Sequence, residues 1–107
     1  MPRDFAARKD ANHSVIVEML QWNGYVVVET FRAGFGAPDF FCLSKSRRWV
    51  AFEVKSEKGG KLSKLEADLF DRCIGAPLFV VRTPEGALEI MAHYDKPDES
   101  YLTDMKI

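Results

Sequence analysis

The sequence predicts a single α/β domain in which helices flank a mixed β-sheet. Apolar residues recur at helical spacing in three segments, at residues 12–23, 62–74 and 84–92. Between the helices lie four short segments rich in β-branched and aromatic residues, which favour strands. The resulting order is α-β-β-β-α-β-α, and a chain of 107 residues has the length of one domain.

The N-terminal half should contain one helix and three strands. Asp10 or Asn12 can cap the first helix, and the Asn23-Gly24 pair ends it. The expected segments that follow are a strand at 25–32, a bend at 33–37, a strand at 39–43, a hairpin loop at 44–48 and a strand at 49–55. The last strand alternates, with Val50, Phe52 and Val54 on one face and Trp49, Ala51, Glu53 and Lys55 on the other.

The C-terminal half should contain two helices around one buried strand at 78–82. A loop at 56–61 leads into the amphipathic helix at 62–74, whose expected inward residues are Leu62, Leu65, Leu69, Phe70 and Cys73. Its outer face carries Lys64, Asp68 and Arg72 at i,i+4 spacing. Thr83 can cap the last helix, whose first residue is Pro84. We expect a basic arm at 1–9 and a polar tail at 94–107.

Composition narrows the class of protein. With 47% hydrophobic and 29% charged residues, the chain fits a globular protein, and no apolar stretch is long enough to cross a bilayer. Cys42 and Cys73 lie in apolar patterns, which favours buried thiols in a reducing compartment over a disulfide or a zinc site. We therefore expect a cytoplasmic location and no membrane partner.

Charge is unevenly distributed, although the formal net charge is only −1. Residues 1–83 hold 13 basic and 10 acidic side chains, whereas residues 84–107 hold 2 and 6. The basic residues cluster as Arg3, Arg8 and Lys9, as Lys45, Arg47 and Arg48, and as Lys58, Lys61 and Lys64. Such clusters fit either a solvated surface or contacts to phosphates.

Asp39 is unusual because it begins an apolar strand directly after Pro38. Glu53 and Lys55 share one face of the next strand, and a hairpin of this length would place Asp39 beside Glu53. Two converging carboxylates repel each other unless a cation intervenes, and oxygen ligands suit Mg²⁺ or Mn²⁺. The plainer alternative is a Glu53–Lys55 salt bridge at a strand edge, with Asp39 merely opening its strand.

These residues resemble the motif of the PD-(D/E)xK nucleases. Pro38-Asp39 followed by Glu53-Val54-Lys55 matches that motif, and Gly36-Ala37-Pro38-Asp39-Phe40 resembles the signature of small phage-type VRR-NUC proteins. Leu62-Ser63 opens a helix as in that family, and the stretch from Arg8 to Asn12 resembles the start of its first helix. The likeness spans roughly residues 8–92 and implies a restriction-endonuclease-like fold.

The resemblance implies a role for each site residue. Asp39, Glu53 and the main-chain carbonyl of Val54 would hold Mg²⁺ or Mn²⁺, and Lys55 would orient or activate the attacking water. Lys58, Lys61 and Lys64 follow this strand and should lie near the DNA backbone.

Two positions depart from the family pattern. Glu66 stands where a glutamine is usual, and it either joins the site or is a surface carboxylate. His13 stands where relatives often have glutamate, and it either packs or caps the helix or, with Asn12, contributes to the site.

The expected function is a metal-dependent DNA endonuclease in a bacterial or phage-infected cell. Family analogy favours branched or junction DNA, and a domain with one site would need a homodimer to cut both strands. A nucleic-acid-binding module that retains the fold without turnover is the alternative, and a plain α/β interaction domain is the third.

Overall fold

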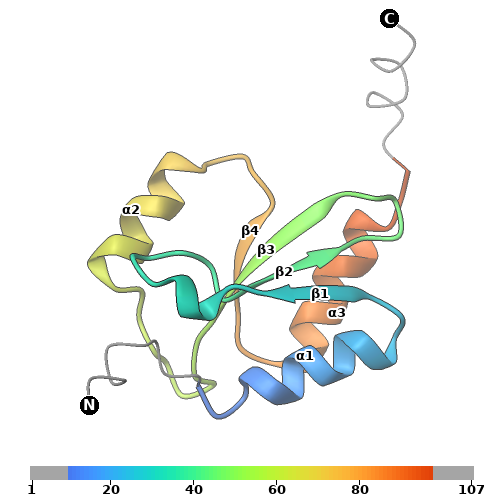
Figure 1. The fold of residues 1–107 in the computed structure, drawn as a ribbon, viewed down its shortest axis with the longest axis horizontal. Helices are drawn as coiled ribbons and strands as arrows, with labels where there is room; N and C mark the ends of the chain where they lie inside the picture. Colours follow the sequence, from blue (N-terminus) through green and yellow to red (C-terminus); the bar gives the residue numbers. More distant parts are fainter. Residues whose placement is uncertain (1–9, 98–107) are drawn as a thin grey trace, which may run out of the picture.

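The structure is a computed structural model that describes residues 10–97 of the chain (Figure 1). The predicted basic arm, and the tail beyond residue 97, lie outside the described residues. The elements are α1 (His13–Trp22), β1 (Val26–Glu29), a short 3₁₀ turn (Phe31–Ala33), β2 (Phe40–Leu43), β3 (Trp49–Val54), α2 (Lys64–Arg72), β4 (Leu78–Val81) and α3 (Pro84–Tyr94). The predicted α/β class and element order are confirmed.

The four strands form one mixed sheet in the order β1-β2-β3-β4. The first three strands are antiparallel neighbours, whereas β4 runs parallel to β3 after the crossover through α2. The register pairs Phe40 with Phe52 across β2 and β3, and Val54 with Val81 across β3 and β4. This pairing brings the end of β3 beside both the start of β2 and the end of β4.

One face of the sheet carries the core. α1 and α3 lie side by side against it, as Figure 1 shows. Fully buried Phe40 and Phe52 stack at the centre with ring centroids 5.1 Å apart. Ile16 and Leu20 of α1 and Met91 of α3 close over them, all without exposed surface. Burying side chains of this size contributes about 1.5–3 kcal/mol each before conformational entropy is subtracted.

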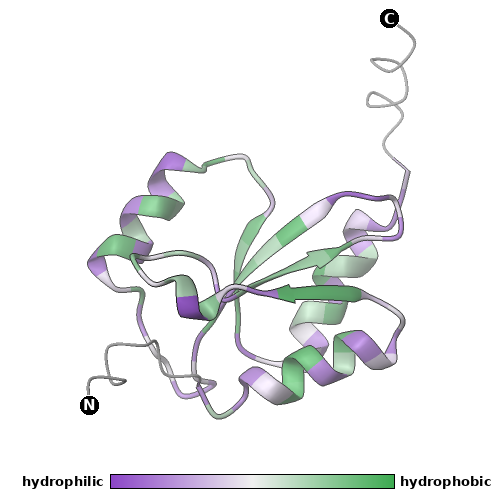
Figure 2. Ribbon diagram, viewed as in Figure 1, coloured by the Kyte–Doolittle hydropathy of each residue, from purple (hydrophilic) through white to green (hydrophobic). Residues whose placement is uncertain are grey.

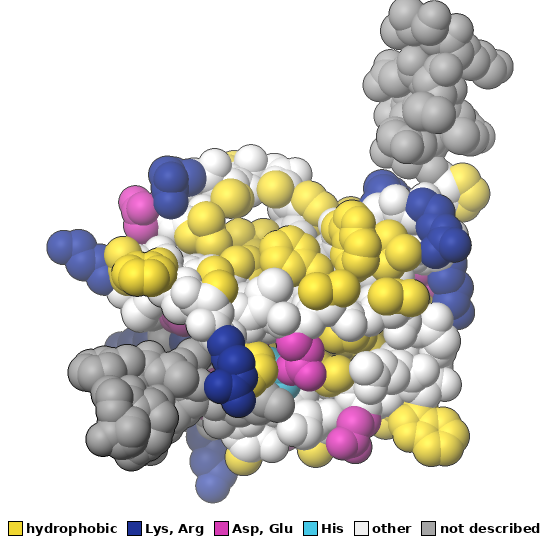
Figure 3. Space-filling model, in the orientation of Figure 1, with side chains coloured by type: hydrophobic (Ala, Val, Ile, Leu, Met, Phe, Trp, Pro, Cys, Tyr) yellow, Lys and Arg dark blue, Asp and Glu magenta, His cyan; other side chains and the backbone are white. Residues whose placement is uncertain are grey.

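The strands are apolar along most of their length, as their green colour in Figure 2 shows. The opposite face of the sheet carries Val26, Val28, Phe41, Leu43, Trp49, Ala51, Leu78 and Val80, with Glu53 at the end of β3. Figure 3 shows hydrophobic side chains gathered over the strands on this side, with charged side chains at the margins. Val26, Val28 and Trp49 are each about half exposed. This face therefore lacks the cover that α1 and α3 give the other.

Helix α2 confirms only in part the prediction that its apolar residues point inward. Within residues 64–72 no side chain is buried, and Leu65 is 56% exposed. Leu62, Leu69, Phe70 and Cys73 are only partly buried. The predicted ion pair between Asp68 and Arg72 forms at 3.2 Å. Amphipathic spacing shows that a helix has an apolar side, but it does not specify what that side contacts.

The predicted caps differ between the helices. Ser63 forms a capping box with Glu66, and Thr83 accepts a hydrogen bond from the Gly86 amide. Asn12 occupies the N-cap position of α1 but its side chain makes no cap hydrogen bond, which corrects the sequence interpretation. The Asn12 side-chain amide instead donates to the main-chain carbonyls of Lys55 and Arg82. The Asn23-Gly24 end of α1 is confirmed, with Gly24 at φ +85°.

The first strand is shorter than the predicted 25–32. Its last pair is Glu29 with Phe40, and the chain then turns through Phe31–Ala33. Pro38 on the neighbouring strand has no amide hydrogen, so the ladder cannot extend past it. Thr30 instead donates its hydroxyl to the Pro38 carbonyl at 2.7 Å.

The two cysteines are free, as the sequence predicts, and Cys42 is buried in the core, whereas Cys73 is only half-buried and does not fill the core as expected. No helix among residues 10–97 combines the length and apolar character that a membrane crossing requires.

The bend at residues 34–36 should tolerate substitution poorly. Gly36 has φ +81°, and an added Cβ would lie 2.9 Å from backbone atoms of Leu65 on α2. We predict that Gly36→Ala lowers the free energy of unfolding by about 3 kcal/mol, from backbone strain plus displacement of α2. Gly24→Ala, at φ +85° with open space around it, should cost only about 1 kcal/mol. Urea denaturation compares the two, and equal losses would contradict the close packing of α2 on this bend.

Candidate functional site

Asp39 and Glu53 meet at the end of the β2–β3 pair, as their spacing predicts. The Asp39 amide donates to the Phe52 carbonyl at 2.8 Å, which continues the ladder by one residue. The Asp39 carboxylate in turn accepts a hydrogen bond of 2.7 Å from the Val54 amide. On the other side, Thr30 donates its amide to the Asp39 carbonyl. Asp39 is thereby fixed between two strands with its carboxylate directed at the end of β3.

Glu53 is the most unusual side chain of the site. It is 3% exposed, and its Oε1 atom is buried without a hydrogen-bond donor. Burial, together with the carboxylates of Glu66 and Asp39, raises the pKa of Glu53 to about 9. A carboxylate can only accept hydrogen bonds, whereas a protonated Glu53 can donate one to either neighbour. At neutral pH Glu53 therefore holds a proton.

Lys55 lies between the acidic side chains. Its Nζ is 2.8 Å from Glu66 Oε1 and 3.6 Å from Glu53 Oε2. Burial acts to lower the pKa of Lys55, but attraction to Glu66 and Glu53 outweighs it and raises the pKa. Burial likewise acts to raise the pKa of Glu66, but the bonds from Lys55 and the Ser63 amide lower it. Lys55 and Glu66 thus form a charged pair beside a neutral Glu53.

Glu66 therefore belongs to the site and is not a distant surface carboxylate. Its Oε1 accepts hydrogen bonds from both the Ser63 amide and Lys55. The capping box of α2 consequently holds Glu66 at the site, although α2 itself lies away from the core. The sequence left open whether Glu66 reaches the site, and its contact with Lys55 decides the question.

Two polar side chains position the loop that follows β3. The Asn12 amide donates to the Lys55 carbonyl at 3.0 Å and to the Arg82 carbonyl at 2.7 Å. Arg82 donates to the carbonyls of Ser56 at 2.7 Å and Gly60 at 3.0 Å. Sequence reasoning missed Arg82. The signal that could have found Arg82 is its position directly after β4. Because β4 runs parallel to β3, the C-terminal ends of the two strands lie side by side.

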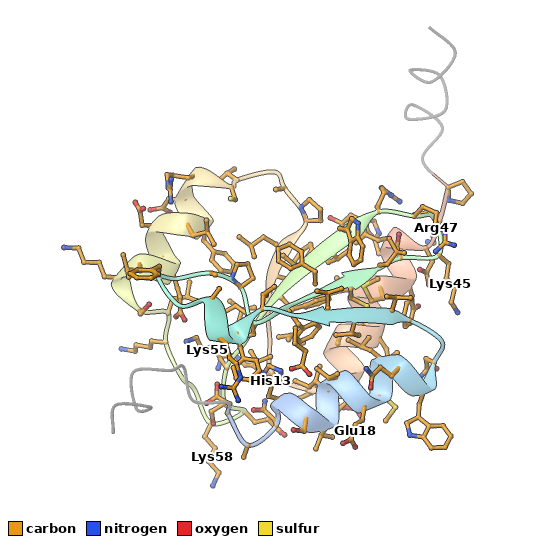
Figure 4. The ribbon with its side chains drawn as sticks, viewed as in Figure 1. His13, Glu18, Lys45, Arg47, Lys55 and Lys58 are labelled. Atoms are coloured by element: carbon orange, nitrogen blue, oxygen red, sulfur yellow. The ribbon has the colours of Figure 1, made fainter. Side chains whose placement is uncertain are left out.

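His13 packs and pairs rather than lining an open site. It is 1% exposed, and its ring meets the edges of Phe31 and Phe40. The Nε2 atom lies 2.7 Å from Glu29 Oε1. The packing interpretation of His13, which is labelled in Figure 4, thus agrees with the structure, and its ring pairs with a carboxylate of β1.

The basic clusters lie in two separate places. Lys58, Lys61 and Lys64 are exposed on the loop after β3 and at the start of α2. In Figure 4, Lys58 projects away from the body of the protein, whereas Lys45 and Arg47 lie at the hairpin end of the sheet. Arg48 donates to the carbonyls of Tyr94 and Lys96, which ties the hairpin to the end of α3. Of these two described clusters, the first is the one that follows the candidate site along the chain, whereas Arg3, Arg8 and Lys9 lie outside the described residues.

The site offers a divalent cation the carboxyl groups of Asp39 and Glu53, to which the resemblance would add the main-chain carbonyl of Val54. Within residues 10–97, no group of three or more His, Cys, Asp or Glu side chains is arranged to hold a metal ion. A site here would therefore combine side-chain and main-chain oxygens, which are ligands that Mg²⁺ and Mn²⁺ accept. The buried Glu53 Oε1 without a donor fits such a cation, because the cation would supply its missing partner.

Comparisons with protein-family models, with curated proteins and with solved structures find no match.

The protonation of Glu53 should make stability depend on pH. Its pKa is about 9 in the folded state against 4.5 ordinarily, so the folded state binds the extra proton between these values. We predict that without divalent cations the free energy of unfolding falls as pH rises through this window, by up to about 1.4 kcal/mol per pH unit. Glu53→Gln should flatten the dependence, whereas Glu18→Gln, exposed on α1, should not. Urea denaturation at several pH values in EDTA measures the slopes, and equal slopes for wild type and Glu53→Gln would place the proton elsewhere.

Proposed function

We propose that this protein is a metal-dependent endonuclease that hydrolyses phosphodiester bonds of DNA, built on a restriction-endonuclease-like fold. The observation that carries the proposal is the convergence of Asp39 and Glu53 beside Lys55, with Glu53 buried and one of its oxygens lacking a donor. Burying such a carboxyl costs stability, and its position at a sheet end serves no packing purpose. A cation-binding role accounts for all three side chains.

Asp39, Glu53 and the Val54 carbonyl would hold Mg²⁺ or Mn²⁺. When bound, the cation would place positive charge beside the scissile phosphate and lower the pKa of a coordinated water. The Val54 amide orients Asp39 through its hydrogen bond, and Glu53 gives up its proton when the cation binds.

Lys55 would act on the attacking water or on the developing negative charge of the phosphate. Its ammonium has three N–H donors, so it could do so while one of them remains bonded to Glu66 at 2.8 Å. Glu66 thus keeps Lys55 charged and near the reacting centre in the absence of substrate. Asn12 holds the Lys55 carbonyl, which fixes the backbone from which the side chain extends.

DNA is the proposed substrate because exposed lysines adjoin the site. Lys58, Lys61 and Lys64 are placed to contact backbone phosphates, which dominate the affinity of DNA-binding proteins. Branched or junction DNA is proposed from the resemblance of the motif, and cutting both strands would require two copies of the chain. The rival is a binding module without turnover, which has no need of a divalent cation.

Asp39→Asn should abolish cation binding and cleavage together. We expect wild-type protein to bind Mn²⁺ in calorimetry, to release protons on binding, and to cut DNA with Mg²⁺ or Mn²⁺. The variant keeps the shape of the side chain but loses its charge, so it should fold and bind no Mn²⁺. Cleavage is assayed on single-stranded, duplex, flap and four-way-junction DNA. DNA binding by the wild type without Mn²⁺ binding and without cleavage of any substrate would favour the rival, and wild-type cleavage by Asp39→Asn would exclude the proposed site.

Lys55→Ala should separate binding from chemistry. Oriented charges at such sites contribute on the order of 3 kcal/mol to lowering a barrier, roughly a hundredfold in rate. We predict that Lys55→Ala lowers the rate of single-turnover cleavage roughly a hundredfold and leaves the affinity for DNA in Ca²⁺ nearly unchanged. Lys58→Ala is the matched control, since it removes the same charge from an exposed position three residues further on. Lys58→Ala should weaken binding and reduce its salt dependence while leaving the rate at saturation unchanged.

A further inference from the structure

The sheet face opposite α1 and α3 has nine outward positions on its four strands. The ninth, Glu53 at the end of β3, belongs to the candidate site, and the other eight are here called the open face. The pairing places Val26 opposite Leu43, Val28 opposite Phe41, Phe41 opposite Ala51, and Ala51 opposite Leu78. Every one of the eight side chains is apolar, as Val26, Val28, Phe41, Leu43, Trp49, Ala51, Leu78 and Val80 show. An antiparallel sheet that exposes one face to water normally alternates apolar and polar residues, and these strands do not.

Figure 3 shows hydrophobic side chains of the described residues gathered over the open face. Val26 is 53% exposed, and Val28 and Trp49 are each 47% exposed. A hollow of about 360 Å³ lies among Val28, Phe41 and Trp49. Isolated exposed apolar residues are common on proteins, but contiguous patches of this kind mark interaction sites.

The chemistry of the open face excludes two occupants. None of its eight positions carries a charge, whereas DNA is bound through lysine, arginine and polar side chains, so DNA is not its ligand.

The second occupant to consider is the C-terminal segment. The ten residues 98–107 carry four larger apolar side chains, at Tyr101, Leu102, Met105 and Ile107. One short segment covers about one strand, whereas four strands spaced about 4.8 Å apart present a much wider surface.

A second copy of the chain fits the open face on three counts. The open face is apolar, so two copies of the chain can pack this face against each other without burying an unpaired charge. Trp49 is half exposed and is one of the residues that line the hollow, so the open face offers a large apolar side chain for a partner to cover. A two-fold axis brings such a surface together with its copy.

We infer that the open face is the interface of a two-fold homodimer, in which two sheets pack face to face. Sheets in this arrangement lie about 10 Å apart, the spacing of an ordinary protein core. The four strands give a broad, contiguous contact, and stable interfaces bury roughly 800 Å² on each partner. The inference stands on the sheet alone and does not depend on the proposed activity.

The dimer would also relate two candidate sites. Glu53 follows Ala51 by two residues on the same face of β3, so each site adjoins the end of the interface. Two sites held by one rigid interface would have a fixed separation, which suits a substrate with two strands. If the proposed activity failed, the dimer would still be expected, and the two failures are therefore distinguishable.

The chain's two tryptophans provide a matched test, because Trp49 lies on the open face and Trp22 lies 87% exposed at the end of α1. Sedimentation of the full chain should show a dimer whose dissociation constant rises roughly a hundredfold or more in Trp49→Arg, since each copy would bury an unpaired charge. Trp22→Arg should leave the dimer unchanged. Val28→Glu is the second open-face variant, and circular dichroism checks that each variant folds.

Fluorescence reads the same event without disturbing the interface. In Trp22→Phe the only tryptophan is Trp49, and its emission should shift to the red on dilution as the dimer dissociates. In Trp49→Phe the remaining Trp22 should show no such shift. A monomer for wild type at high concentration would overturn the inference. So would a dimer that persists in folded Trp49→Arg and Val28→Glu, or a monomer that dimerises only when residues 98–107 are deleted, which would make that segment the cover.

Discussion

The antiparallel pairing of β2 with β3 is the constraint on which the candidate site depends. The register that stacks Phe40 on Phe52 in the core also sets Asp39 beside Glu53 on the opposite face. A slip of one residue would exchange the two faces, bury Asp39 against α1 and bring Phe40 into the site. The hairpin at the far end of the strands fixes this register, with Ser44 accepting the Arg48 amide and Arg47 in the left-handed region at φ +71°. The geometry of the site is therefore set by a turn at the other end of the sheet.

Within the candidate site, an ion pair and several hydrogen bonds offset the cost of burying a carboxyl group. Glu53 is buried at a cost to stability and keeps a proton, while Lys55 and Glu66 remain charged as a pair. The fold provides the surrounding hydrogen bonds, from Val54 to Asp39, from Asn12 to the Lys55 carbonyl, and from Arg82 to the loop beyond. Local instability of this kind persists only where the surrounding structure fixes it, and it is typical of functional sites.

The two faces of the sheet differ in what covers them. The face under α1 and α3 contains the aromatic stack and the fully buried aliphatic residues, so it supplies most of the folding free energy. The opposite face is also largely apolar, but α2 packs on the bend at Gly36 and leaves Val26, Val28 and Trp49 exposed. A chain of this size that keeps both faces apolar is suited to bury the second one against a partner.

The sequence by itself determined the local structure and the pairing of the two carboxylates. Helical spacing, strand composition and the Thr83-Pro84 start of α3 are encoded within a few residues, so they could be predicted, as could the convergence of Asp39 with Glu53 across a short hairpin. The contacts of Asn12, Glu66 and Arg82 could not be predicted, because each joins segments between 11 and 70 residues apart. Amphipathic spacing likewise placed Leu65 on an apolar side of α2 without specifying its surroundings. Only the tertiary structure decided that α2 stands away from the sheet, because the packing of a helix depends on the surfaces it meets and not on its own periodicity.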